Sequence, residues 1–102
     1  MKTIFIKQPY AFEWDKGNWD KNFVKHKITN QEIEEVFFDD NKLLLEDVLH
    51  SNTETRFILI GKTSHRKLLF IVFTIRNQKV RVVSARPLHK KEIAIFKLDS
   101  NE

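Results

Sequence analysis

Four apolar runs between residues 42 and 86 alternate with turn-like segments, and this spacing constrains the fold more than any other feature. The runs span 42–47, 55–63, 67–75 and 79–86. The segments 64–66 and 76–78 are so short that the strands they join must be antiparallel neighbours, so we predict a four-stranded meander. Residues 68–73 are apolar at every position, which predicts a central strand covered on both faces.

A first helix is predicted over residues 16–26, because apolar side chains recur there at helical spacing with lysines opposite. Trp19 and Phe23 share the apolar face and are expected to turn toward the core. Asp15 precedes the segment and is expected to cap its first turn, since a carboxylate can accept a hydrogen bond from an orphan backbone N–H.

A second helix is marked more clearly by its start. Thr29 and Glu32 have the spacing of a capping box, in which each side chain accepts a hydrogen bond from the backbone N–H of the other residue. Ile33, Val36 and Phe37 then follow at the spacing of one buried stripe. The sequence therefore predicts a helix that packs its apolar side against the strands.

A last helix is predicted over 88–98, with Ile93 and Phe96 turned inward. Residues 10–14 are expected to be extended, and 3–6 to form a short strand. The predicted fold is therefore α+β: an N-terminal strand and two helices, an antiparallel meander and a C-terminal helix. Three helices are too few to cover both sides of the sheet, so apolar surface should remain for a protein partner, either a second copy or a different chain.

The 102 residues suffice for one domain with one core, expected over residues 1–102. The chain contains no cysteine, which is consistent with a reducing cytosol. The N-terminal apolar run is too short for a signal peptide and no stretch approaches a membrane span, so we expect a cytoplasmic protein. The four histidines share no metal-ligand spacing and the two glycines are isolated, so neither a metal nor another cofactor is expected.

The charges divide the chain into two halves. Residues 1–54 carry seven lysines against eleven acidic residues, a net charge of −4. All five arginines lie between Arg56 and Arg86, and no acidic residue occurs from Thr55 to Lys91. Such a block of cations points to a phosphate backbone as its partner, the alternative being a solvated basic face. Arginine favours the first interpretation, because its guanidinium binds phosphate through two parallel hydrogen bonds.

An ordered string of motifs resembles the BrnT toxins over about residues 12–96. It comprises Phe12-Glu13-Trp14-Asp15, Lys25-His26, His50-Ser51, Arg56-Phe57, Arg81-Val82-Val83-Ser84-Ala85-Arg86 and Glu92. The resemblance implies a fold like that of the RelE-type ribonuclease toxins, and a bacterial toxin that cleaves RNA and inhibits translation. It also implies neutralisation by a BrnA-like antitoxin of ribbon-helix-helix type, in a hetero-oligomer or beside a toxin homodimer.

Two positions depart from the family pattern. Lys27 stands where the family usually has the glycine that ends a helix in the left-handed conformation, so strain is expected there. Phe96 stands where the family has an aromatic residue near the final glutamate, and it lacks a hydroxyl group.

Cleavage of RNA without a metal requires the extra negative charge on the phosphorus to be stabilised, a task that suits arginine. Arg56, Arg81 and Arg86 are the candidates for this phosphate clamp. Arg81 and Arg86 are five residues apart, so on a regular strand their side chains would point to opposite faces of the sheet. They can share a face only if a β-bulge lies between them or if Arg86 lies beyond the paired part of the strand. The alternative for each arginine is a surface ion pair with the acidic half.

Proton transfer is assigned to histidine or glutamate. His26 ends the first predicted helix, where the helix dipole favours the imidazolium ion, although it could serve only to complement that dipole. Glu54 or Glu92 could act as a base, or either could be a structural partner of the arginines. Neighbouring cations would lower the pKa of such a carboxyl group and make it a weaker base. His50 could be a base that the carboxylate of Asp47 or Glu54 orients, or simply a loop histidine.

RNA contacts are assigned to side chains around this basic face, namely Lys25, Lys62, Lys79, Ser84 and His50. Trp14, Trp19 and Phe57 could stack on unpaired bases, but an aromatic residue at helical or strand spacing is more often in the core, where we expect Trp19 and Phe57. The leading hypothesis is a metal-independent endoribonuclease toxin. The alternative is a non-catalytic nucleic-acid-binding or protein-interaction domain that uses the same basic strand face.

Overall fold

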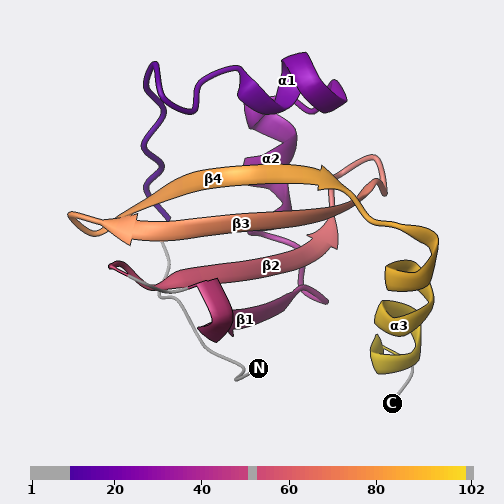
Figure 1. The fold of residues 1–102 in the computed structure, drawn as a ribbon. Coiled ribbons are helices and arrows are strands. Elements are labelled where there is room, and N and C mark those ends of the chain that lie inside the picture. Colours follow the sequence, from indigo (N-terminus) through magenta and orange to yellow (C-terminus); the bar gives the residue numbers. More distant parts are fainter. Residues whose placement is uncertain (1–9, 51–52, 101–102) are drawn as a thin grey trace.

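The computed structural model describes residues 10–50 and 53–100, without the side chains of 96–100. Its elements are α1 (Lys21–His26), α2 (Asn30–Val36), β1 (Leu43–Asp47), the 3-10 turn η1 (Val48–His50), β2 (Arg56–Lys62), β3 (Leu68–Arg76), β4 (Lys79–Pro87) and α3 (Lys90–Ser100). This order confirms the predicted α+β layout (Figure 1). The short strand predicted over residues 3–6 lies outside the described residues.

The four strands form one antiparallel sheet in the order β1-β2-β3-β4, so the predicted meander is confirmed. Helix α2 lies behind the sheet in Figure 1 and covers one of its faces. Leu59, Ile71 and Phe73 point to that face and are fully buried. We call the opposite face, which is turned to the viewer in Figure 1, the outer face.

Strand β3 is central, but only one of its two faces is fully buried. Leu69, Ile71 and Phe73 are buried, whereas Phe70 and Val72 on the outer face are half-buried. The prediction that both faces of this strand are covered is therefore confirmed for the face that packs on α2 and holds only in part for the outer face, where Thr74 is 1% exposed.

The start of α2 follows the predicted capping box. The Thr29 hydroxyl accepts a hydrogen bond from the Glu32 N–H at 3.0 Å, and the Glu32 carboxylate accepts one from the Thr29 N–H at 2.9 Å. Ile33, Val36 and Phe37 are buried as predicted. This helix supplies the apolar layer against which the sheet packs.

Helix α1 differs from its prediction at both its start and its buried face. It begins at Lys21, because residues 16–18 form a turn in which Asp15 accepts a hydrogen bond from the Gly17 N–H instead of capping the helix. Trp19 is 59% exposed and Phe23 47% exposed, so neither lies in the core. The helix lies along the edge of β4, whose backbone groups require polar partners, and its buried residue is Asn22.

Residues 10–14 are extended, as predicted, and run beside β4. Phe12 forms a parallel bridge with Val80, and the Glu13 N–H donates to the Val80 carbonyl at 2.8 Å. Phe12 packs on the core from the same side as Val80. Glu13, next along the segment, therefore points to the outer face.

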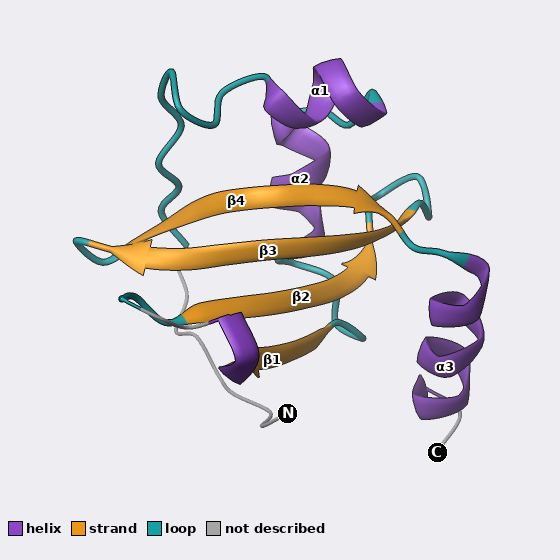
Figure 2. Cartoon of the chain, viewed as in Figure 1, coloured by secondary structure: helices purple, strands orange, loops and turns teal. Residues whose placement is uncertain are grey.

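Helix α3 leaves the end of the sheet and stands beside it (Figure 2). Leu88, just before the helix, is buried, Ile93 is half-buried, and Ile95 is 60% exposed. The prediction that Phe96 turns inward falls on a side chain outside the described ones. No helix in the described part of the chain has the length and apolarity needed to cross a membrane.

Candidate active site

One irregularity in the pairing of β3 with β4 decides where the arginines point. Phe73 pairs with Val82 and Val72 pairs with Ser84, which leaves Val83 as an extra residue in β4. This β-bulge reverses the alternation of side chains beyond it. Arg81 and Arg86 therefore share the outer face, although their spacing on a regular strand would place them on opposite faces.

A row of four residues crosses the sheet at the β3–β4 hairpin end of the outer face. Asp47, Arg56, Thr74 and Arg81 come from successive strands and pair in direct register. Directly opposed residues share a face, and two strand spacings place Arg56 and Arg81 about 10 Å apart at their Cα atoms. Two long guanidinium side chains thus originate on the same surface, close enough to contact one nucleotide.

A histidine–carboxylate pair lies at one end of this row. The Nδ1 atom of His50 is 2.8 Å from the Oδ2 atom of Asp47. Asp47 is 8% exposed, while the His50 side chain is 68% exposed. With its Nδ1–H donated to Asp47, the imidazole has an oriented ring and presents Nε2 as the basic nitrogen.

Arg81 is held by two carboxylates from the N-terminal segment. It donates to Glu13 at 2.9 Å and to Asp15 at 2.7 and 3.0 Å. The hydrogen bond from Arg81 lowers the pKa of Asp15 below its usual value. The guanidinium is therefore fixed in direction at the edge of the sheet, with its charge offset by acidic side chains.

Glu54 forms a similar pair with Arg76. The two side chains make parallel hydrogen bonds of 2.9 and 2.8 Å. The hydrogen bond from Arg76 lowers the pKa of Glu54, and the charges of Arg56 and Arg81 lower it further. Glu54 is thus bonded to Arg76 and stabilised as an anion by two arginines of the row, so this carboxylate is a poor proton acceptor near neutral pH.

Arg86 lies at the other end of the outer face. Arg86 pairs with Phe70 of β3, and Arg81 pairs with Thr74 of the same strand. Phe70 and Thr74 are four residues apart, so Arg86 lies about 13 Å from the arginine row along the strands. Its guanidinium lies 4.2 Å from the Phe70 ring centroid and makes two hydrogen bonds, of 2.7 and 2.8 Å, to Glu92. This pairing lowers the pKa of Glu92 to about 2. Glu92 also accepts a hydrogen bond from the His89 N–H at 2.8 Å, so the pair fixes the start of α3.

The other predicted residues are distributed around the molecule. Lys79 is exposed opposite Arg76, and Ser84 is half-buried between the two ends of the outer face. Lys62 is exposed at the far end of β2, and Lys25 is exposed on α1.

His26 ends α1 and is half-buried. Asn18 contacts the Val82 carbonyl and Asn22 the Ala85 N–H, so this segment runs with β4 and carries His26 away from the Arg81 end.

Sequence reasoning missed the two acidic partners of Arg81. Glu13 and Asp15 lie 68 and 66 positions from Arg81 in the chain, and the sequence assigned them only to an acidic half. The available signal was the alternation of residues 10–14, which predicts an extended segment. It did not show which strand this segment would join. Phe57, by contrast, packs against the core and stacks on Phe73, as predicted.

The family described as "Ribonuclease toxin, BrnT, of type II toxin-antitoxin system" matches residues 14–92. The chain belongs to the BrnT family. This membership makes it a ribonuclease toxin of a type II toxin–antitoxin system, with an RNA substrate and an antitoxin partner. A search among curated proteins found no significant match. In the part of the BrnT chain that the structure describes, no three histidine or acidic side chains gather into a metal-binding group.

Proposed function

We propose that this BrnT chain is an endoribonuclease that cleaves RNA without a metal ion, inhibits translation and is neutralised by a BrnA-like antitoxin. The observation that carries this proposal is the in-register row of Asp47, Arg56 and Arg81, with His50 bound to Asp47. The row combines two half-buried guanidinium groups with an oriented, exposed imidazole on one face of the sheet. These are the groups that cleavage next to a ribose hydroxyl requires.

In the proposed reaction, the Nε2 atom of His50 takes the proton of a ribose 2′-hydroxyl. The 2′-oxygen then forms a bond to the adjacent phosphorus while the bond from phosphorus to the 5′-oxygen breaks. The products are a 2′,3′-cyclic phosphate and a 5′-hydroxyl that takes its proton from water, and the hydroxide left behind takes the proton from His50, which restores the neutral imidazole. Arg56 and Arg81 stabilise the charge that develops on the phosphoryl oxygens, which is the contribution a metal ion would otherwise make.

The ion pairs of the arginines are compatible with this role. Glu13 and Asp15 hold Arg81, whose side chain is 16% exposed, and the Asp15 side chain is 53% exposed, so water and salt screen its ion pair. A phosphate group can therefore replace the Asp15 carboxylate as a partner of Arg81. The carboxylates keep the guanidinium oriented until RNA binds.

We assign proton abstraction to His50 in preference to Glu54 and His26. Glu54 has a lowered pKa and is already paired with Arg76, so we assign it the positioning of that arginine. His26 lies on the segment that runs toward the Arg86 end of β4. Arg86, about 13 Å along the face, is assigned to a phosphate farther along the RNA. The side chains assigned to further RNA contacts are Lys25, Lys62, Lys79 and Ser84.

The test is cleavage of RNA by the purified protein in the presence of EDTA. We expect Arg81→Ala and His50→Gln each to reduce the cleavage rate by about 10²-fold or more, because each removes a group that acts in the transition state. Arg66→Ala removes the same charge from the β2–β3 turn at the opposite end of the sheet and serves as the matched control. It should cleave nearly as fast as the wild type.

Two outcomes would replace this proposal. RNA that stays intact at a large excess of protein, while it binds in a salt-sensitive manner, would identify a non-catalytic nucleic-acid-binding domain. Cleavage that requires an added divalent cation would exclude the metal-independent reaction. Growth arrest on induction in a bacterial host, relieved by Arg81→Ala at equal soluble expression, would link cleavage to toxicity. Labelled amino-acid incorporation would then test the inhibition of translation.

A further inference from the structure

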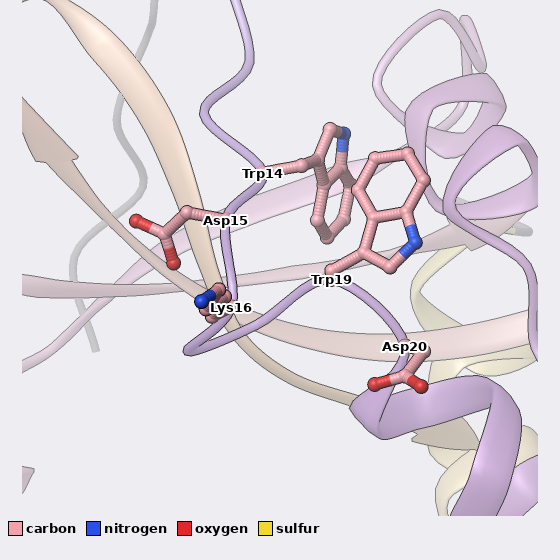
Figure 3. Close-up of a pocket in the computed structure, with 5 residues that line it drawn as sticks. All are labelled: Trp14, Asp15, Lys16, Trp19 and Asp20. Atoms are coloured by element: carbon pink, nitrogen blue, oxygen red, sulfur yellow. The ribbon is translucent and has the colours of Figure 1, made fainter.

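Two tryptophans beside the arginine row form a surface that the proposed reaction does not use. Trp14 and Trp19 line an open hollow of about 450 Å³ together with Asp15, Lys16 and Asp20 (Figure 3). The indole of Trp14 is fixed, because its Nε1–H donates to Glu34 at 2.7 Å. The hollow therefore has one rigid aromatic wall.

Trp19 also lines a second hollow. This hollow has a volume of about 300 Å³ and is lined by Trp19, Asp20, Phe23, Thr29 and Asn30. Trp19 is 59% exposed and Phe23 is 47% exposed. We call these two side chains, with the two hollows that Trp19 lines, the Trp19 ridge. Exposed aromatic side chains beside two hollows have the composition of a binding surface for a protein partner.

The charges around the ridge indicate which partner it fits. Asp15 and Asp20 both line the first hollow, against a single cation, Lys16. Asp15 is paired with Arg81, so Asp20 is the carboxylate that would repel a phosphate backbone at this hollow, and the tryptophans are poorly placed to stack on RNA bases. Indole faces beside carboxylates instead attract lysine and arginine side chains, through cation–π contacts and ion pairs.

We propose that the Trp19 ridge is the docking site for a basic segment of the antitoxin. In this arrangement an apolar side chain fills one hollow, and a neighbouring lysine or arginine lies over Trp19 and pairs with Asp20. The identity of the partner rests on the proposed function, because the family membership implies an antitoxin.

Docking at the ridge would also block the arginine row. Asp15 lines the first hollow, and the same carboxylate makes hydrogen bonds of 2.7 and 3.0 Å to Arg81. A segment seated on the ridge therefore lies next to Arg81, where RNA is proposed to bind. The inhibition of the toxin follows from this coverage and needs no change in the fold.

The experiment measures the affinity of the toxin for the protein encoded beside its gene, by biolayer interferometry. We expect Trp19→Ala to weaken binding about 30-fold or more, as for an aromatic residue at the centre of an interface. Asp20→Lys should slow association several-fold, because it reverses the charge that attracts the basic segment. Neither residue belongs to the arginine row, and Asp20 makes no capping bond at α1, so both variants should fold and cleave RNA like the wild type.

Two control variants change the same properties elsewhere. Ile95→Ala removes an exposed apolar side chain from α3, and Asp40→Lys reverses an exposed acidic residue after α2. Both should bind the antitoxin with unchanged affinity. In the cleavage assay, Trp19→Ala and Asp20→Lys should still cleave RNA at antitoxin concentrations that inhibit cleavage by the two control variants.

Three results would overturn the inference. The first is wild-type affinity in both ridge variants, or no antitoxin binding by the wild type. The second is a loss of RNA affinity in Trp19→Ala, which would make the ridge part of the RNA site. The third is self-association of the wild type that Trp19→Ala abolishes, which would assign the ridge to a second copy. Antitoxin binding that Trp19→Ala weakens, in a protein that leaves RNA intact, would refute the proposed reaction and support the docking site.

Discussion

Arginines of this BrnT chain form ion pairs with acidic residues that lie outside the arginine-rich segment of the sequence. No acidic residue occurs between Thr55 and Lys91, yet Arg76, Arg81 and Arg86 each make hydrogen bonds to a carboxylate. The partners are supplied by the N-terminal segment, the loop before β2 and the first turn of α3. Each pair holds its guanidinium in one direction, which reduces the conformational entropy that binding a phosphate must overcome.

A single backbone position carries the strain predicted from the family pattern. Lys27 has φ 59° and ψ 31°, the left-handed conformation in which glycine ends many helices. A residue with a Cβ atom is disfavoured there by about 1–2 kcal/mol. Lys27→Gly relieves this strain, so we expect it to raise the free energy of unfolding by about 0.5–1 kcal/mol. The gain is smaller than the strain because the cation–π contact of Lys27 with Phe23 is lost and glycine has more freedom in the unfolded chain.

Urea unfolding followed by circular dichroism measures this effect. Lys25→Gly, two residues earlier in α1, is the matched control and should lower stability by about 1 kcal/mol, since glycine weakens a helix at a position with ordinary dihedral angles. A Lys27→Gly variant that is less stable than the wild type would show that no strain is stored at this helix end.

At the scale of elements, the attachment of α1 to the edge of β4 is the feature that the helical periodicity did not predict. The Ala85 N–H donates to the Asn22 side chain at 2.9 Å, and the Asn18 amide donates to the Val82 carbonyl at 3.2 Å. Buried asparagines thus satisfy backbone groups that an edge strand leaves without partners. Since polar residues face the sheet, the aromatic side chains of this segment are turned to the surface.

Asn22→Ala should therefore lower the free energy of unfolding more than the small change in side-chain volume suggests. The substitution leaves the buried N–H of Ala85 without its acceptor, which costs about 1–3 kcal/mol. Thermal and urea unfolding give the loss directly. Val24→Ala, at a position 69% exposed on the same helix, should change stability by less than about 0.5 kcal/mol. Equal effects of the two substitutions would mean that α1 is not held through Asn22.

At the scale of the whole molecule, the acidic and basic halves pack against each other and make stability depend on pH. The native structure lowers the pKa of Asp15, Glu54 and Glu92, in each case chiefly through a hydrogen bond from an arginine. A carboxyl group whose pKa is lower in the folded than in the unfolded state stabilises the fold fully above its unfolded pKa. That contribution is lost as the pH falls through the folded pKa.

For Glu92 this window runs from its ordinary value of 4.5 down to about 2. Linkage allows at most about 3 kcal/mol over this range, and we expect about 1 kcal/mol because water reaches the ion pair. Urea unfolding between pH 7 and pH 2.5 should show the decline in the wild type. Glu92→Gln should be less stable than the wild type at pH 7 and should lose less stability on acidification. If the stabilities of the wild type and Glu92→Gln fell in parallel with decreasing pH, the lowered pKa of Glu92 would not be a source of the pH dependence.

The sequence by itself determined the elements whose signals are local. The capping box of Thr29 and Glu32 and the short turns of the meander depend on neighbours in the chain. The left-handed position of Lys27 was expected from the family pattern. The ordered motifs also indicated the family. These features were predictable because their physical causes, backbone hydrogen bonds and steric limits on φ and ψ, act within a few residues.

Only the tertiary structure decided the arrangement of the candidate site. The bulge at Val83 reverses the direction of Arg86, and residues 10–14 bring Glu13 and Asp15 to Arg81. Periodicity also misassigned Trp19, because it shows which residues share a face and leaves open whether that face meets the core or the solvent. Register, edge pairing and the direction of a helix face depend on contacts between distant residues, which packing selects when the chain folds.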